Sequence, residues 1–324
     1  MTSMFLRDTP GRTAMHKENF LSVAIASNDR FDLLHRVIDS VHQHADMPYE
    51  IVVADDAGHR HLDLSVFQPF RDKVSRLVIN CGMNQGLAVN ANQAIGATRG
   101  RNVVFLSDDS LILRPFMREV FQILDEAPYL GVLYLGQAHG NGPGFPEIAR
   151  AEGLLRARTR SGAELMLHCH HGDSWANAFR KEYWHEVGGY AEDDVYGDLP
   201  FLNKGWRRGY FCGAVAGPRI AYDVDVVELG KSRGSVSFQA HGALCHYPRL
   251  FGLPEAELVR MGRERNAACQ KRNHEGRAAR FNEYDCHDWV SYMKRASAAG
   301  GADWSVLEEH HRRFRVELER DLLP

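Results

Sequence analysis

Two adjacent carboxylates, Asp108 and Asp109, raise the clearest chemical question in this sequence. They come directly after Ser107 and the apolar run Val103–Leu106, so they stand at the end of a segment suited to a buried strand. Neighbouring carboxylates repel each other and resist burial. Two interpretations are open: a turn whose acids cap a helix, or a site for Mg²⁺ or Mn²⁺, which carboxylates hold together with phosphate oxygens.

Polar residues also follow the first two apolar runs of the chain, at Asn28-Asp29 and at Asp55-Asp56. If these runs are parallel strands of one sheet, their carboxyl ends lie at the edge where open α/β sheets bind ligands. Together with the pair at 108–109, these residues predict one polar rim. For Asp55 and Asp56 the alternative is a plain Asx-turn after a strand.

The elements that must position this rim are predicted from hydrophobic spacing. We expect strands at Leu21–Ala26, Tyr49–Ala54, Arg76–Asn80, Asn102–Leu106 and Gly131–Leu135, and helices at Phe31–His44, Gly86–Ala97 and Phe116–Glu126. Strands that alternate with helices predict an α/β fold with a parallel sheet covered on both faces. The Gly- and Pro-rich segment Gln137–Pro146 is predicted to be a loop, and the alternation fails after it.

Composition places the chain among ordinary globular proteins and sets aside several classes. It has 324 residues, 44% hydrophobic and 25% charged, with a net charge of −3. This charge gives no global attraction to nucleic acid or to an anionic membrane. No apolar run reaches the roughly 20 residues that span a bilayer, and the N-terminal segment lacks the apolar core of a signal peptide. The 6 scattered cysteines suit reduced thiols; we therefore expect a cytoplasmic protein.

The segment Arg260–Arg280 is locally basic, with seven Lys or Arg against two Glu. Such a charge run is usually a solvated face, and contact with an anionic acceptor, including nucleic acid, is the minority interpretation. The sequence has no Gly-rich phosphate-binding loop after the first strand, because neither of the two common motifs for such a loop occurs there. A diphosphate at the polar rim would therefore depend on the metal.

Four segments resemble the family-two glycosyltransferases of the GT-A fold, in order and in spacing: LSVAIASNDR (21–30), YEIVVADDAG (49–58), NQGLAVNANQAIGATRG (84–100) and VVFLSDDS (103–110). Further along, WHEVGGYAEDDVYGDLPF (184–201) resembles the family's Gly-Gly segment with its downstream acid. The resemblance covers roughly residues 20–225. It implies a GT-A fold, which is Rossmann-like with a mostly parallel sheet flanked by helices, and a nucleotide-sugar donor, commonly a UDP-sugar.

The resemblance assigns roles to the acids. It implies that Asp109 binds the metal and that Asp108 faces the ribose, while Ser107 stands where the family's motif begins with another Asp. Asp55 or Asp56 is implied to recognise the base by accepting a hydrogen bond from its imino N–H.

Further donor contacts are implied for two other segments. Ala26 and Ser27 would line the nucleotide through their backbone groups. Asn84 and Gly86 would let the chain pass close to the donor.

The catalytic base implied by the resemblance is Asp198, although the Glu that usually precedes it is Gly197 here. The nearby acids at 192–194 remain alternatives. An inverting mechanism would use this carboxylate to accept the proton of the acceptor hydroxyl. Many relatives add a further metal ligand after the base, for which Asp223 and His246 are the first candidates, followed by His241.

Two other features have both a structural and a functional interpretation. The loop at His168, His170 and His171 could bind zinc, but without a second ligand pair a wall of the acceptor site is preferred. Trp175 is either a platform for a sugar ring or part of the core.

We predict four parts: a flexible N-terminus (1–19), a donor-binding half (20–136), an acceptor-binding half (137–250) and a helical C-terminal extension (251–324). The rival interpretations are a sugar-nucleotide-binding scaffold without turnover and a transferase acting on nucleic acid through the basic segment. A nucleotidylyltransferase is disfavoured, because its Gly-rich basic loop after the first strand is absent. The acceptor (glycan, lipid-linked, protein, small molecule or nucleic acid) and a homo-oligomeric state stay open, and a lipid-linked acceptor would require docking at the periphery of a membrane.

Overall fold

The computed structural model describes residues 20–27, 30–56, 64–79, 87–135, 137–138, 155–168, 176–191, 201–202, 204–205, 208–215 and 220–222, and the single positions 260, 264, 308, 309 and 312. Within these residues no helix has the length and apolar character needed to cross a membrane. The described positions beyond 250 are all helical.

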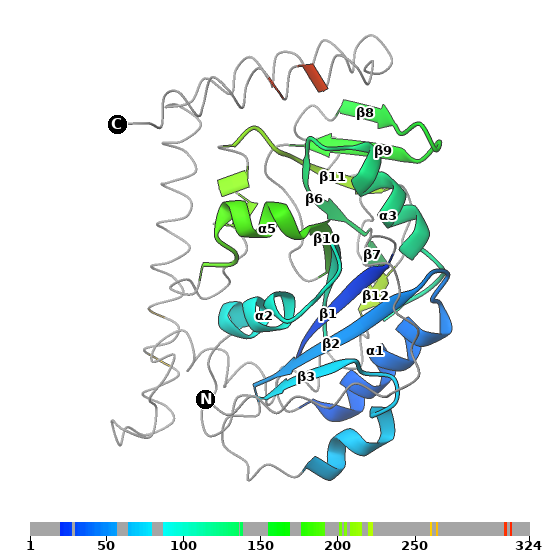
Figure 1. Cartoon of the computed structure of the whole chain (residues 1–324), viewed down its shortest axis with the longest axis vertical. Helices are drawn as coiled ribbons and strands as arrows, with labels where there is room; N and C mark the ends of the chain where they lie inside the picture. The colour runs from blue at the N-terminus through cyan, green and yellow to red at the C-terminus, as the bar shows by residue number, and fades with distance from the viewer. Residues whose placement is uncertain are drawn as a thin grey trace.

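The first half of the chain forms the parallel part of a nine-stranded sheet (Figure 1). Its strands are β1 (Leu21–Ser27), β2 (Tyr49–Asp55), β3 (Arg76–Ile79) and β4 (Asn102–Ser107), in the order β3-β2-β1-β4. All three pairings among them are parallel. The apolar runs of the sequence therefore became parallel strands, as predicted, with boundaries that differ by one residue; β1, β2 and β4 are mostly buried, whereas β3 is partly exposed.

The sheet becomes mixed beyond β4. Its remaining strands are β10 (Ala176–Arg180), β6 (Leu130–Tyr134), β11 (Phe211–Val215), β9 (Glu164–His168) and β8 (Leu155–Arg158), in that order. Strand β10 runs antiparallel to both β4 and β6, whereas β6 and β11 are parallel. The α/β sheet with flanking helices is therefore confirmed, but it is mixed: all pairings in the first half are parallel, whereas β10, β9 and β8 bring antiparallel pairings into the second half.

Helices cover both faces of the sheet (Figure 1). They are α1 (Phe31–Gln43), α3 (Met117–Glu126), α2 (Leu87–Gly96) and α5 (Lys181–Val187), with a 3₁₀ helix η1 (Leu64–Phe70). The side chains of β1 alternate between the two faces, as the period of a strand requires. Leu21, Val23 and Ile25 join the cluster that contains the buried residues of α1 and α3. Ala24 and Ala26 join the cluster of α2 and α5.

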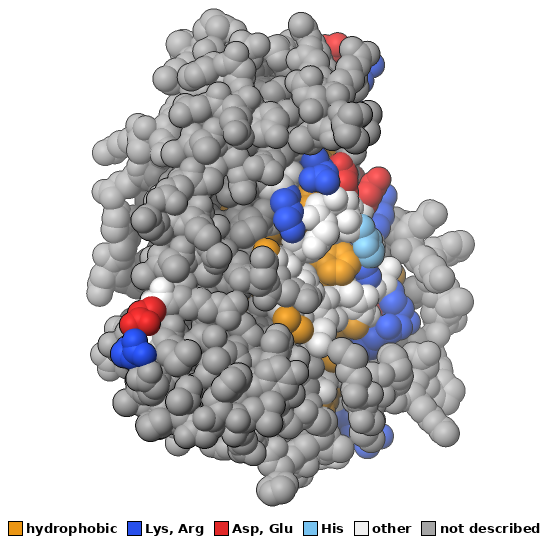
Figure 2. All heavy atoms as spheres, turned by 90° about the vertical axis from the view of Figure 1, so that its left-hand side faces the viewer, with side chains coloured by type: hydrophobic (Ala, Val, Ile, Leu, Met, Phe, Trp, Pro, Cys, Tyr) orange, Lys and Arg blue, Asp and Glu red, His pale blue; other side chains and the backbone are white. Residues whose placement is uncertain are grey.

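The small residues on the second face let α2 approach the sheet closely. Ala88, Ala91 and Ala94 of the helix are buried in the same cluster as the alanines of β1 and Ala54 of β2. Figure 2 shows the side of the molecule on which α2 and α5 lie, where the described hydrophobic side chains form small separate spots and the Lys and Arg side chains lie mostly toward the margin of the described surface.

A small second sheet adjoins the predicted acidic turn. It has the order β5-β12-β7, with β5 at Ser110–Ile112, β12 at Ile220–Tyr222 and β7 at Gln137–Ala138. Strand β12 pairs antiparallel with β5, so that Tyr222 lies opposite Ser110. The sequence did not predict this sheet, and β7 occupies the first residues of the segment that we expected to be entirely a loop.

Candidate donor site

The carboxyl ends of β1, β2 and β4 meet at one edge of the sheet, and the described residues of the predicted polar rim meet there with them. Ser27 is paired in register with Asp55, and Ala26 is paired with Ser107. The main-chain N–H of Asp56 donates to the main-chain oxygen of Ser27 at 2.8 Å. Ala26, Ser27, Asp55, Asp56 and Asp108 are all buried.

Asn90 fastens the ends of β1 and β2 together from helix α2. Its side-chain Nδ2 donates to the main-chain oxygens of Ser27, at 2.9 Å, and of Ala54, at 3.0 Å. The residue is itself buried, so both hydrogen bonds are shielded from water. The sequence analysis assigned no role to Asn90, although an amide between the alanines on the apolar face of this helix was a usable signal.

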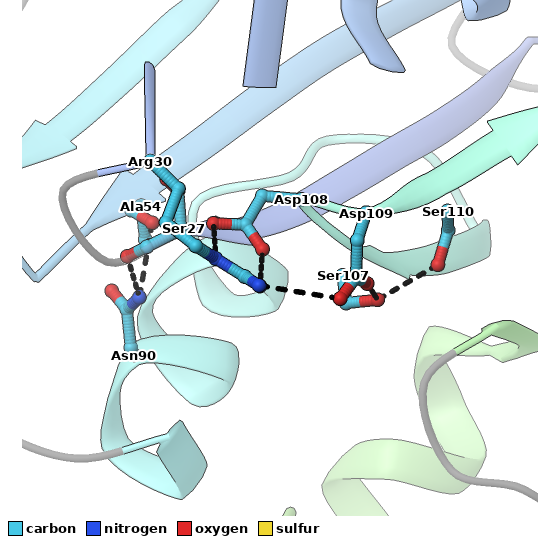
Figure 3. Close-up of polar contacts among 8 residues, drawn as sticks. All are labelled: Ser27, Arg30, Ala54, Asn90, Ser107, Asp108, Asp109 and Ser110. Carbon is cyan, nitrogen blue, oxygen red and sulfur yellow. Dashed lines mark hydrogen bonds and ion pairs between the residues drawn. The ribbon is translucent and has the colours of Figure 1, made fainter. Parts of the chain in front are cut away.

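Arg30 contacts both of the adjacent carboxylates, Asp108 and Asp109. Its guanidinium holds both oxygens of Asp108, through Nε to Oδ2 at 3.0 Å and through Nη2 to Oδ1 (Figure 3). Its Nη1 donates to Oδ2 of Asp109 at 3.3 Å. The repulsion between the carboxylates is therefore offset by one cation, which comes from the start of α1, 78 residues before Asp108.

Burial and charge act in opposite directions on this group. Burial raises the pKa of Asp108 above its ordinary value, although the adjacent Arg30 guanidinium opposes the shift. Burial alone would lower the pKa of Arg30, but Asp108 and Asp109 outweigh that effect and raise it. A buried carboxylate without this guanidinium would be still easier to protonate. Arg30 therefore favours the charged form of Asp108.

Ser107 organises the second carboxylate. Its hydroxyl donates to Oδ1 of Asp109 and lies 2.7 Å from the hydroxyl oxygen of Ser110, which is buried (Figure 3). A third carboxylate at position 107 would add repulsion, whereas a hydroxyl supplies a hydrogen bond. The departure from the family's motif therefore still leaves a group that holds Asp109 in place.

The Gly-Gly segment that follows α5 packs against α2 through Asn92. The side-chain amide of Asn92 exchanges hydrogen bonds with the main chain of Tyr190, both at 2.9 Å. Gly188 and Gly189 have φ angles of 75° and 67°, a left-handed conformation that favours glycine. At Gly189 a side chain would also come within 2.6 Å of Oδ1 of Asn92.

Five predicted site residues lie outside the described residues: Asn84, Gly86, Asp198, Asp223 and His246. The same holds for His241, His170, His171 and Trp175, and His168 ends β9. Among the residues that the structure describes, no three His, Cys, Asp or Glu side chains form a group that could hold a metal ion.

The resemblance implies a divalent cation, and the two carboxylates differ in how well they fit one. Asp109 offers hard oxygen donors of the kind that Mg²⁺ and Mn²⁺ prefer, and its side chain is 20% exposed. Asp108 is 2% exposed, and both of its oxygens accept hydrogen bonds from Arg30. Of the two carboxylates, Asp109 is therefore the one whose oxygens are more accessible to a cation, and further ligands would have to come from outside the described residues.

Comparisons with known proteins found similarity at the level of sequence and of fold. An uncharacterized glycosyltransferase of Haemophilus influenzae is 22% identical over 178 residues; the match covers 52% of this chain and 55% of the relative, so the chain spans about half of that relative's length. The crystal structure of S. aureus TarS 1-349 in complex with UDP is similar with a TM-score of 0.51 and 15% identity, covering 93% of this chain and 89% of that one.

The family profile described as glycosyl transferase family 2 matches residues 22–188, a little over half of the chain. The matched region includes all but the first residue of β1, and β2 and β4 with the acidic turn, and it ends at the Gly-Gly segment. The chain therefore belongs to glycosyl transferase family 2.

Proposed function

We propose that this protein transfers a sugar from a nucleotide-diphosphate sugar, with a UDP-sugar as the first choice, to an acceptor hydroxyl. The observation that carries the proposal is the convergence of Asp55, Asp108 and Asp109 at the carboxyl edge of parallel strands, where open α/β sheets bind ligands. UDP is the first choice because the crystal structure of TarS, whose fold is similar, is that of a complex with UDP.

Within this proposal the donor lies across the ends of β1, β2 and β4. Asp55 or Asp56 accepts from the base, Ala26 and Ser27 contact the nucleotide through backbone groups, and Asn84 and Gly86 allow a close approach of the chain. Asp108 faces the ribose. A carboxylate oxygen has more than one acceptor site, so Asp108 can accept from a ribose hydroxyl while Arg30 holds it.

Asp109 is proposed to hold Mn²⁺ or Mg²⁺, with one further ligand from the second half of the chain. When bound, such an ion stabilises the negative charge of a departing diphosphate. The pairing of β12 with β5 favours Asp223 over His246 as the second ligand. Tyr222, which immediately precedes Asp223, lies opposite Ser110, which immediately follows Asp109.

Asp198 is proposed as the base of an inverting reaction. Its carboxylate accepts the proton of the acceptor hydroxyl while that oxygen attacks the anomeric carbon, and the bond from that carbon to the diphosphate breaks. The chain is anchored on both sides of this segment. Tyr190 and Phe201 are buried and their rings stack, with centroids 4.5 Å apart.

A donor-hydrolysis screen tests the proposal. The protein is incubated with a panel of nucleotide sugars, with and without Mn²⁺, and free nucleoside diphosphate is measured. We expect release from one donor class that depends on the metal. Asp198→Asn should bind the same donor and lose about 10²–10⁴-fold in rate, the usual cost of a missing general base. Asp194→Asn is the matched control, and donor binding without any release would instead identify a scaffold without turnover.

A further inference from the structure

Arg30 contacts the two carboxylates unequally. Asp108 receives a two-pronged contact from Nε and Nη2, the arrangement in which a guanidinium binds a carboxylate most firmly. Asp109 receives a single hydrogen bond at 3.3 Å, to one oxygen. The side chain of Asp109 is also the more exposed of the two, at 20% against 2%. The contact to Asp109 is therefore the one that can be exchanged for another cation without uncovering the buried carboxylate.

A divalent cation at Asp109 would meet the Arg30 guanidinium at the same carboxylate. Two positive groups within a few ångströms repel each other strongly in a partly buried setting. The two carboxylates with Arg30 amount to a single net negative charge, which attracts a divalent ion weakly. A nucleoside diphosphate brings additional negative charge, so the site then attracts the divalent ion more strongly.

We infer that Arg30 is an internal counter-ion of the donor site: it occupies Asp109 while the donor is absent, and yields it to a divalent cation that arrives together with a nucleoside diphosphate. The inference rests on the proposed function, because it takes Asp109 as the metal ligand. Arg30 keeps Asp108 throughout, so it acts as a positioning residue for that carboxylate. The consequence is that metal and nucleotide bind cooperatively, each weakly when alone.

The alternative is that Arg30 only neutralises a buried acid and orders the turn. The two interpretations predict opposite changes in nucleotide-free metal affinity when Arg30 is replaced. A competing cation weakens nucleotide-free metal binding, so its removal tightens it. A group that merely orders the ligands strengthens metal binding, so its removal weakens it.

The test titrates the full chain with Mn²⁺ and follows the paramagnetic resonance signal of the unbound hydrated ion, with and without UDP. Arg30→Gln should bind Mn²⁺ on the order of tenfold more tightly than wild type without nucleotide. Arg30→Lys keeps the positive charge but loses the two-nitrogen contact to Asp108, so its Mn²⁺ affinity without nucleotide should stay close to that of wild type. The gain should disappear in Arg30→Gln combined with Asp109→Asn, and thermal unfolding of each variant verifies that it is folded.

A second readout follows from the reciprocity of linked binding. UDP should increase Mn²⁺ affinity strongly in wild type and by a smaller factor in Arg30→Gln, because no competing cation remains to be displaced. Equal or weaker nucleotide-free affinity in Arg30→Gln overturns the inference, as does an Arg30→Lys variant that behaves like the Gln variant.

Failure of the proposed function has a different signature. Wild type would then show no increase in Mn²⁺ affinity on addition of UDP. If instead that increase is present while wild type and Arg30→Gln bind Mn²⁺ equally without nucleotide, the inference alone is wrong.

Discussion

The ring of Tyr190 stacks on the ring of Phe201, with centroids 4.5 Å apart and planes 14° from parallel. Phe179, Tyr183 and Phe105 surround this pair through further ring contacts. The stack joins the two ends of the segment that contains Asp198, so the core itself anchors the chain on either side of the proposed base.

Replacing Phe201 with Leu should therefore lower kcat more than it changes the KM for the donor. The substitution removes the stack while most of the buried volume remains, with an expected loss of about 1–2 kcal/mol in the free energy of unfolding. Phe116→Leu is the matched control, because Phe116 is equally buried but belongs to the core on the other face of the sheet. A similar fall of kcat in both variants would show that general destabilisation, not anchoring, is responsible.

Asn90→Ala should weaken UDP binding as well as stability. The change removes two buried hydrogen bonds to the ends of β1 and β2, and the loss of such partners costs about 1–3 kcal/mol. Asn102→Ala is the control, since Asn102 is also buried but lies at the opposite end of β4. Calorimetry with UDP and chemical denaturation of both variants check the prediction; it fails if UDP affinity is unchanged in Asn90→Ala.

Ser107→Ala should reduce the metal-dependent part of UDP affinity, by several-fold, because Asp109 loses the hydroxyl that donates to Oδ1. Ser40→Ala is a suitable control: the Ser40 hydroxyl accepts from the main-chain N–H of Ile112 in β5 but does not belong to the acidic turn. UDP titrations at fixed Mn²⁺ compare the two. Equal affinities in the two variants would mean that Asp109 needs no support from position 107.

The adjacent glycines after α5 predict unequal costs for the same substitution. Gly188 has a left-handed φ but nothing within 4 Å of an added Cβ, so Gly188→Ala should cost only about 1–2 kcal/mol of backbone strain. Gly189→Ala adds a contact of 2.6 Å to Oδ1 of Asn92 and should cost clearly more in the free energy of unfolding. Chemical denaturation of the two variants measures these losses. Equal losses in the free energy of unfolding would contradict the packing of Asn92 against this segment.

Much of the donor half could be predicted because its signals are local. Apolar runs that stop at Ser27, Asp55 and Ser107 identify buried strands and their carboxyl ends, and helical spacing identifies α1 between the first two. The structure brings the described rim residues together as the parallel arrangement requires.

The features that were missed depend on contacts between distant parts of the chain. Nothing near Arg30 in the sequence indicates that it will meet Asp108, 78 residues later. The antiparallel direction of β10 is likewise set by its pairing with the distant strands β4 and β6. The short strands β5, β7 and β12 were missed because two- or three-residue strands carry no periodic pattern of their own.

We propose that Asp109 binds the cation that accompanies the donor, and calorimetry of UDP with Mn²⁺ tests this role. Wild type should bind UDP tightly in the presence of Mn²⁺ and weakly without it. Asp109→Asn keeps the shape of the side chain and removes its charge, so it should lose the effect of Mn²⁺ while its thermal unfolding stays close to that of wild type. Unchanged UDP affinity in Asp109→Asn at saturating Mn²⁺ would show that Asp109 does not bind this cation.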